Sequence, residues 1–139
     1  MTYDQTWPDR AFASNFLLTA LLAFPIACFS LTVLTDVAYV RTLNLLWLHF
    51  SEWLLLAGLV FGILAALVAL IDFAIRRVRH AWLAVLGGIV VLLLAALNSF
   101  IHTADGWTAV MPYGLTVSIV TVLAMIVTGW LGRRGVYHA

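Results

Sequence analysis

The sequence predicts an all-α integral membrane protein, a bundle of four membrane-spanning helices with both termini in the cytoplasm. Three observations predict it: an apolar composition, four apolar runs of spanning length, and an uneven distribution of arginine. Of the 139 residues, 65% are hydrophobic and 9% are charged, with a mean hydropathy of +1.10. Soluble domains contain about 45–50% apolar and about 25% charged residues. Lipid is therefore the expected solvent for most of the surface.

The four runs are predicted to be helices of a single domain. A hydrocarbon core about 30 Å thick requires about 20 apolar residues in a helix. Residues 16–34, 47–71, 81–101 and 110–131 meet this requirement. Backbone groups do not stay unpaired in lipid, and none of the runs alternates polar with apolar residues, so helices are favoured over strands. The connections are too short for a further domain, so one four-span domain is expected over residues 1–139.

The arginines predict the orientation, because the chain contains no lysine. With four spans, both termini and the middle connection lie on one side of the membrane. That side carries Arg10, Arg76, Arg77, Arg79, Arg133 and Arg134, whereas the other side carries only Arg41. By the positive-inside rule, the arginine-rich side faces the cytoplasm.

Aromatic residues are predicted to mark the two membrane boundaries. Trp47, Trp53 and Trp107, together with Tyr39, fall at the predicted outer boundary, and Trp82 and Trp130 fall at the inner one. Indole and phenol rings are apolar at one end and polar at the other, which suits them to this interface. We therefore expect them to be membrane anchors.

Small residues at helical spacing predict close contacts between helices. They are Gly58, Gly62 and Ala66 in the second span, Gly88 in the third, and Gly114 and Ser118 in the fourth. Small side chains allow two helices to approach closely enough for dispersion to stabilise the contact. The pattern fits either the internal contacts of the bundle or a contact with another subunit.

Ionisable residues are predicted to gather at the outer boundary rather than at mid-depth. His49 and Glu52 are three residues apart and share a helix face, and His102 and Asp105 follow the end of the third apolar run. Asp36 is predicted to end the first span, at a similar height. A proton pump or ion-coupled transporter is expected to place such groups at mid-depth, so this pattern weighs against transport.

The boundary cluster has two interpretations. Two histidines on facing helices can ligate haem, and histidine with carboxylates can bind a metal ion, which would use His49, Glu52, His102 and Asp105. The alternative is that these polar side chains are simply solvated where the spans end. The sequence contains no HExxH, CxxC or CxxCH motif. No cofactor is therefore predicted, and a b-type haem between His49 and His102 is kept as an alternative.

Three long segments of the sequence carry a family resemblance: "FPIACFSLTVLTDVAY" (Phe24–Tyr39), "SEWLLLAGLVFGILAALVALIDF" (Ser51–Phe73) and "YGLTVSIVTVLAMIVTGWLG" (Tyr113–Gly132). They resemble a family of bacterial membrane proteins, the domain of unknown function 2231. The resemblance implies a four-helix protein of the bacterial inner membrane and brings no established reaction. Where the family has a histidine and an asparagine, this chain has Ala84 and Gly88. Such departures indicate a divergent member and argue against transferring a cofactor site.

The leading functional prediction is a small accessory or scaffold subunit with no catalysis of its own. It would pack against partners in a larger respiratory or pigment–protein membrane assembly, or against further copies of itself. A haem-binding redox protein is the first alternative. A carrier of a small solute or quinone, placed at Pro25 within the first span, is the second. No basic tail or face suggests a nucleic-acid partner.

Overall fold

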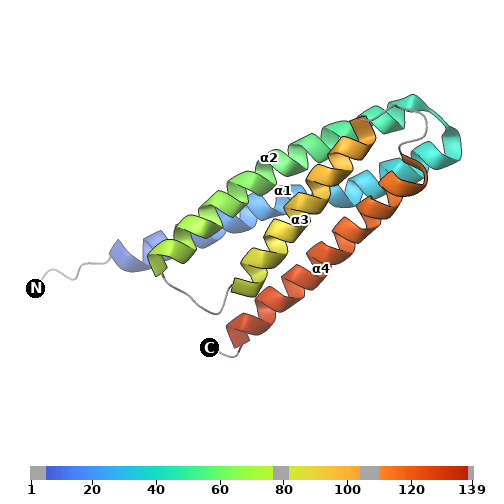
Figure 1. Ribbon diagram of the computed structural model, residues 1–139. Coiled ribbons are helices and arrows are strands. Elements are labelled where there is room, and N and C mark those ends of the chain that lie inside the picture. The colour runs from blue at the N-terminus through green and yellow to red at the C-terminus, as the bar shows by residue number, and fades with distance from the viewer. Residues whose placement is uncertain (1–5, 77–81, 104–109, 138–139) are drawn as a thin grey trace, which may run out of the picture.

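Four long helices run up and down the bundle in chain order (Figure 1). The structure, a computed structural model, describes residues 6–76, 82–103 and 110–137, and the side chains of residues 16–74, 82–103 and 111–132. The helices are α1 (Thr6–Thr42), α2 (Leu45–Arg76), α3 (Trp82–Thr103) and α4 (Leu115–Tyr137), with the short π-helix η2 (Val110–Gly114) before α4. All described residues except Leu43 and Asn44 are helical. The all-α prediction is therefore confirmed over the described part of the chain.

Each of the four helices is long and apolar enough to cross a membrane. The candidate spans are Phe16–Thr42, Leu45–Ala74, Trp82–Thr103 and Met111–Gly132. The start of α1 and the end of α4 lie at the same end of the bundle, as four spans require (Figure 1). Which end is cytoplasmic stays a prediction of the arginine distribution. Arg77 and Arg79 lie outside the described residues, as do the side chains of the other arginines on that side, Arg10, Arg76, Arg133 and Arg134.

Helix α1 extends past the end of the first predicted span. Its apolar run ends at Leu34, but α1 continues through Thr35 and Asp36 to Thr42. The helix then stops because Leu43 adopts a positive φ of 54°, and its N–H donates to the Tyr39 carbonyl over 2.7 Å, which closes the last turn. The Asn44 side chain accepts a hydrogen bond from the Leu46 N–H at 3.0 Å and caps α2. The result is a tight α1–α2 hairpin.

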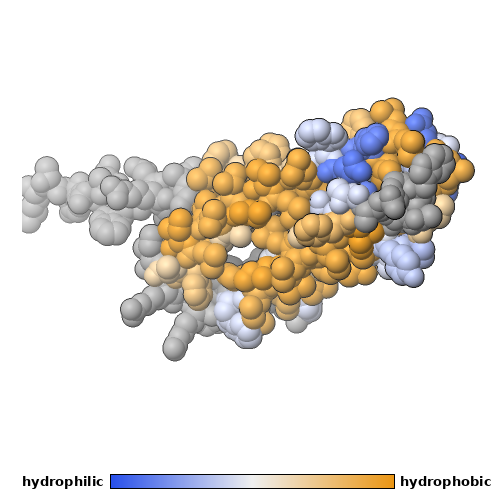
Figure 2. Space-filling view, turned by 45° about the horizontal axis from the view of Figure 1, so that its top comes forward, coloured by the Kyte–Doolittle hydropathy of each residue, from blue (hydrophilic) through white to orange (hydrophobic). Residues whose placement is uncertain are grey.

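The apolar interior is narrow, and most large apolar side chains face outward. The main buried cluster contains Phe29, Leu55, Val91 and Ala95, drawn from α1, α2 and α3. Ala124 and Met125 of α4 pack against it. In Figure 2 the visible described surface is hydrophobic along most of the bundle, and hydrophilic residues gather at the hairpin end. This distribution is expected for helices whose outer faces contact lipid.

Glycines let the helices approach one another inside the bundle. A Cβ on Gly58 would overlap the ring of Phe29, and one on Gly62 would lie 2.7 Å from Leu92 Cδ2. These two predicted packing residues therefore serve contacts of α2 with α1 and α3, while Ala66 is half-buried. In α3, the close approach to α4 is made by Gly87, where a Cβ would overlap Thr128. The sequence had assigned packing to Gly88, which meets no atom within 4 Å.

Three of the tryptophans predicted to be membrane anchors lie on the surface of the bundle. Trp53, Trp82 and Trp130 are exposed on the outside of the bundle, and Trp47 contacts the ring of Phe50. Trp107 lies outside the described residues. Tyr39 corrects the prediction, because it is buried against Leu48 beneath the hairpin. It contributes to the bundle interior rather than to the outer aromatic belt.

We predict that Gly87→Ala destabilises the bundle by about 1–3 kcal/mol, because the added methyl group would overlap Thr128 across the α3–α4 contact. Gly88→Ala is the matched control: its methyl group would enter open space, and it should leave the stability unchanged or raise it by up to about 1 kcal/mol, because alanine favours the helix. Unfolding in mixed detergent micelles, followed by tryptophan fluorescence, measures both. Equal effects of the two variants would contradict this packing of α3 against α4.

Candidate functional site

Asp36 is a fully buried carboxylate that contacts all three other helices. Its Oδ1 accepts a hydrogen bond from the Ser51 hydroxyl of α2 at 2.6 Å and lies 2.9 Å from Nε2 of His102 on α3. Its Oδ2 accepts a hydrogen bond from the Ser118 hydroxyl of α4 at 2.6 Å. Asp36 and His102 side chains are both 0% exposed. One side chain of α1 thus links the four helices.

His102 shares one proton with Asp36. Its Nδ1 lies 2.9 Å from the Asn98 carbonyl oxygen, one turn earlier in α3. A carbonyl oxygen only accepts, so Nδ1 carries a hydrogen. The contact between Nε2 and Asp36 Oδ1 then requires one further proton, held either by the imidazolium or by the carboxylic acid. The pair is therefore neutral as a whole, which lowers the cost of burying it.

A second layer of polar side chains surrounds the pair. The Asn98 amide Nδ2 donates to Ser118 Oγ at 2.7 Å, and Thr35 Oγ1 lies 2.7 Å from Ser51 Oγ. Asn98 Oδ1 is buried and has no hydrogen-bond partner among the described residues. We call Thr35, Asp36, Ser51, Asn98, His102 and Ser118 the polar network. All six side chains are buried.

The network lies near the hairpin end of the bundle. Asp36 precedes the turn at Leu43 by seven residues, which is about 10 Å along a helix. His102 is next to the last residue of α3, and Ser118 lies in the first turn of α4. The network residues of the four helices lie at one level of the bundle because α1 and α2 extend past the ends of α3 and α4 (Figure 1). A charged pair near a span end, enclosed by protein, costs less than one at mid-depth in lipid.

The geometry does not favour nucleophilic catalysis. Ser51 and Ser118 both donate to the Asp36 carboxylate, whereas an activated serine would donate to the histidine. The side chains of Asp36 and His102 are enclosed, so no substrate can reach them in this conformation. The chemistry that remains is hydrogen bonding between helices and the gain or loss of protons.

The structure does not bring the predicted boundary cluster together. His49 Nδ1 lies 3.2 Å from Glu52 Oε2, and the His49 side chain is 64% exposed. His102 is instead buried against Asp36, and both of its ring nitrogens are engaged in hydrogen bonds. Neither nitrogen is free for iron, which argues against the haem hypothesis. Asp105 lies outside the described residues.

No group of three or more His, Cys, Asp or Glu side chains in the described ranges is arranged to hold a metal ion. The residues that the sequence did not assign to a site are Asp36, Ser51 and Asn98. The sequence feature that could have revealed the site is Asp36 itself, a carboxylate flanked by the mostly apolar segments "SLTVLT" and "VAYV". It was interpreted as the end of a span, because an apolar run alone does not reveal that four helices supply partners at that level.

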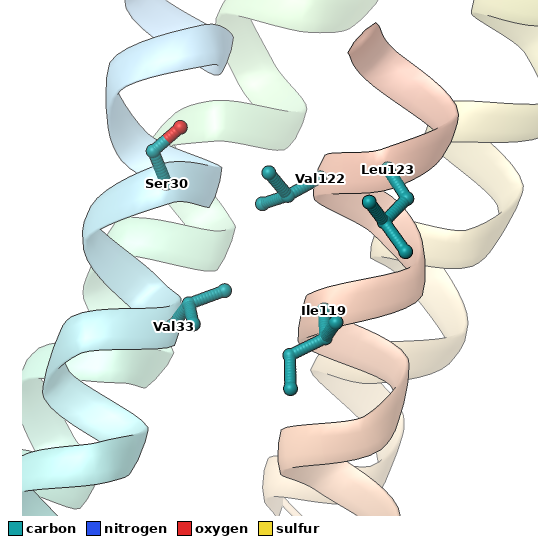
Figure 3. A pocket seen from close by; sticks show the side chains of 5 residues that line it. All are labelled: Ser30, Val33, Ile119, Val122 and Leu123. Atoms are coloured by element: carbon teal, nitrogen blue, oxygen red, sulfur yellow. The ribbon is translucent and has the colours of Figure 1, made fainter. Parts of the chain in front are cut away.

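A shallow groove separates α1 from α4 on the outside of the bundle (Figure 3). It is lined by Ser30 and Val33 of α1 and by Ile119, Val122 and Leu123 of α4, with a cavity volume of about 180 Å³. Its lining is almost entirely apolar. The Ser30 hydroxyl is the one polar side-chain group among these lining residues.

We predict that Asp36→Leu and His102→Leu each destabilise the bundle by about 3–5 kcal/mol, because each leaves its partner buried without its counter-charge. The double variant should cost clearly less than the sum of the two, because it removes both members of the pair. Equilibrium unfolding of the four proteins in mixed micelles measures this coupling.

The control is His49→Gln, which alters the exposed pair with Glu52 and should change the free energy of unfolding by at most about 1 kcal/mol. Additive effects of Asp36→Leu and His102→Leu, or single effects as small as that of the control, would contradict the buried pair.

Comparison with known proteins gives one result. Residues 19–139 match the sequence profile of the domain of unknown function 2231, described as a predicted membrane protein. No curated protein and no solved structure matches the chain. The match extends from the first span to the end of the chain and includes every residue of the polar network. The chain therefore belongs to the family of predicted membrane proteins called domain of unknown function 2231.

Proposed function

We propose that the protein is a small integral-membrane accessory subunit, which packs against the membrane helices of partner proteins in a larger assembly and catalyses no reaction itself. A respiratory or pigment–protein complex of the bacterial inner membrane is the kind of assembly envisaged. The observation that carries the proposal is a pair of open glycines, one on α3 and one on α4.

The two glycines lie at one level of the α3–α4 pair. An added Cβ on Gly88 or on Gly129 would meet no atom within 4 Å. Each follows, by one residue, a member of the contact between Gly87 and Thr128. When two antiparallel helices touch at one residue of each, the next residue along each chain faces the same side of the helix pair. Gly88 precedes the buried Val91 by three residues and the buried Ala95 by seven, so this side faces the rest of the bundle. The two glycines leave an open notch on this side, and Gly129 is exposed.

Such a notch suits another membrane helix. In lipid, helices associate through close backbone approach at small residues, because there is no hydrophobic driving force between them. The polar network supports the same function indirectly, since its enclosed groups offer nothing to a substrate. What the bundle presents to its surroundings is its shape and its apolar side chains, including large exposed ones such as Leu93 and Phe100.

The two alternatives gain no support from the geometry. A haem between His49 and His102 would need a free nitrogen on His102, and both are engaged. A carrier site was placed at Pro25, but Pro25 is buried on the side of α1 that faces Gly62. The groove beside Ser30 has about 180 Å³, below the range of about 300–1,000 Å³ common for small-molecule sites.

We predict that the double variant Gly88→Leu/Gly129→Leu loses a partner that co-purifies with the wild-type chain from native membranes in mild detergent. The leucines would fill the notch and keep a partner helix at a distance, while the bundle itself should remain folded, because a Cβ at either position meets no atom within 4 Å. Native mass spectrometry of the two preparations identifies the partner and its loss.

The matched control is Ala27→Leu, a small-to-large change on the exposed outer face of α1. It should retain the partner. A wild-type chain that purifies as a lone monomer, or a partner retained equally by all three proteins, would contradict the proposed role of the notch.

A further inference from the structure

Asn98 Oδ1 is the one buried side-chain acceptor in the described part of the chain that lacks a hydrogen-bond donor. Its own amide Nδ2 donates to Ser118 Oγ, whose hydroxyl donates in turn to Asp36 Oδ2. The buried amide oxygen thus sits at one end of a chain of two hydrogen bonds, and the carboxylate sits at the other. An acceptor left unsatisfied in this way costs free energy, so its retention calls for an explanation.

We propose that Asp36, Ser118 and Asn98 form a proton-binding site inside the bundle, which takes up one proton beyond the proton that Asp36 shares with His102. The ligand is H⁺ from water at the hairpin end of the bundle. The inference is independent of partner binding and holds whether or not the notch at Gly88 is occupied.

Reversal of the two hydrogen bonds accommodates the added proton. The proton forms an O–H bond at Asp36 Oδ2, and this hydroxyl donates to Ser118 Oγ. The Ser118 hydroxyl then turns away from Asp36 and donates to Asn98. A half-turn of the Asn98 amide brings Oδ1 to face Ser118 and carries Nδ2 to the place that Oδ1 occupied. Two hydrogen bonds exist before and after, and no covalent bond breaks.

The other two partners of Asp36 hold their places during this change. Ser51 and His102 both contact Oδ1, the oxygen that does not receive the proton. His102 remains attached to the Asn98 backbone carbonyl, which does not move when the amide side chain turns. Proton uptake therefore alters the α1–α4 and α3–α4 links and spares the links from α1 to α2 and α3.

One ionisable group near the site, Glu52, favours an added positive charge. On α2, Glu52 follows Ser51, is only partly exposed, and lies within electrostatic range of His102. Glu52 also pairs with His49 on the same helix. On α1, the ionisable neighbours are the buried Tyr39 and the exposed Arg41 at the helix end. On α4, residues 115–131 carry no ionisable side chain, and η2 carries only the exposed Tyr113. Glu52 is thus the carboxylate available to balance the added positive charge.

Infrared difference spectroscopy of the full chain in lipid nanodiscs tests the proposal as the pH is lowered. We expect the carbonyl stretch of a protonated carboxyl group to appear, together with a change in an asparagine amide band. Both signals should be absent from Asp36→Asn. They should persist in Asp72→Asn, the matched control, whose carboxylate lies near the opposite end of α2.

Asn98→Leu removes the amide oxygen that would accept from the Ser118 hydroxyl. The infrared signal of the protonated carboxyl group should then appear only at about tenfold higher proton concentration, since a tenfold change corresponds to the free energy of about one hydrogen bond. Where Asp36→Asn does not fold, Ser118→Ala replaces it, and the carbonyl stretch should then move because the protonated carboxyl loses its acceptor. The proposal is overturned by a wild-type chain that shows no protonated carboxyl band at any pH at which it stays folded. It is also overturned by a band that survives Asp36→Asn, or by an Asn98→Leu titration that coincides with that of the wild type.

Discussion

The Asp36 carboxylate accepts hydrogen bonds from side chains on α2, α3 and α4, and the arrangement of the bundle depends on this convergence. Helices in lipid gain little from burying apolar side chains, because the surrounding solvent is equally apolar. The described apolar core is correspondingly narrow, and its main cluster contains four buried side chains, among them Phe29 and Leu55. Close approach at Gly58 and Gly87 brings the helices together, and the polar network fixes their relative level.

The network also explains why α1 is long. A helix that ended at Leu34, where the apolar run stops, would leave Asp36 in the connection between spans. Because Ser51, His102 and Ser118 satisfy the carboxylate, the helix continues past Leu34 without exposing the charge of Asp36 to lipid. The hairpin at Leu43 and Asn44 then sits beyond the ends of α3 and α4, and Tyr39 and Leu48 close the bundle beneath it.

Four helices, their order and their spanning length followed from the sequence, since apolar run length and the cost of unpaired backbone in lipid determine them. The site followed only in part. Asp36 and His102 were placed at a similar height, but His102 was paired with His49 rather than with Asp36. Run length gives depth along a helix and says little about which face turns inward. In α3, the choice between Gly87 and Gly88 depended on the same rotation, and it too required coordinates.

A buried polar centre and an apolar exterior with one open notch are compatible features of a small accessory subunit. The polar network sets how the four helices pack, and the notch at Gly88 and Gly129 is the proposed contact for a partner helix. Protonation at Asp36 would alter the contacts of α4, one of the two helices that form the notch. The two proposals nevertheless stand on different residues and different measurements.

The most direct test of this account is a solid-state NMR correlation between the imidazole nitrogens of His102 and the carboxyl carbon of Asp36, recorded on isotopically labelled full-length protein in lipid bilayers. A cross-peak is predicted between Nε2 and the Asp36 carboxyl carbon, because Nε2 and Oδ1 lie 2.9 Å apart. A His102 ring that shows no contact with Asp36 and instead correlates with Glu52 or with water would contradict the central role assigned to this pair.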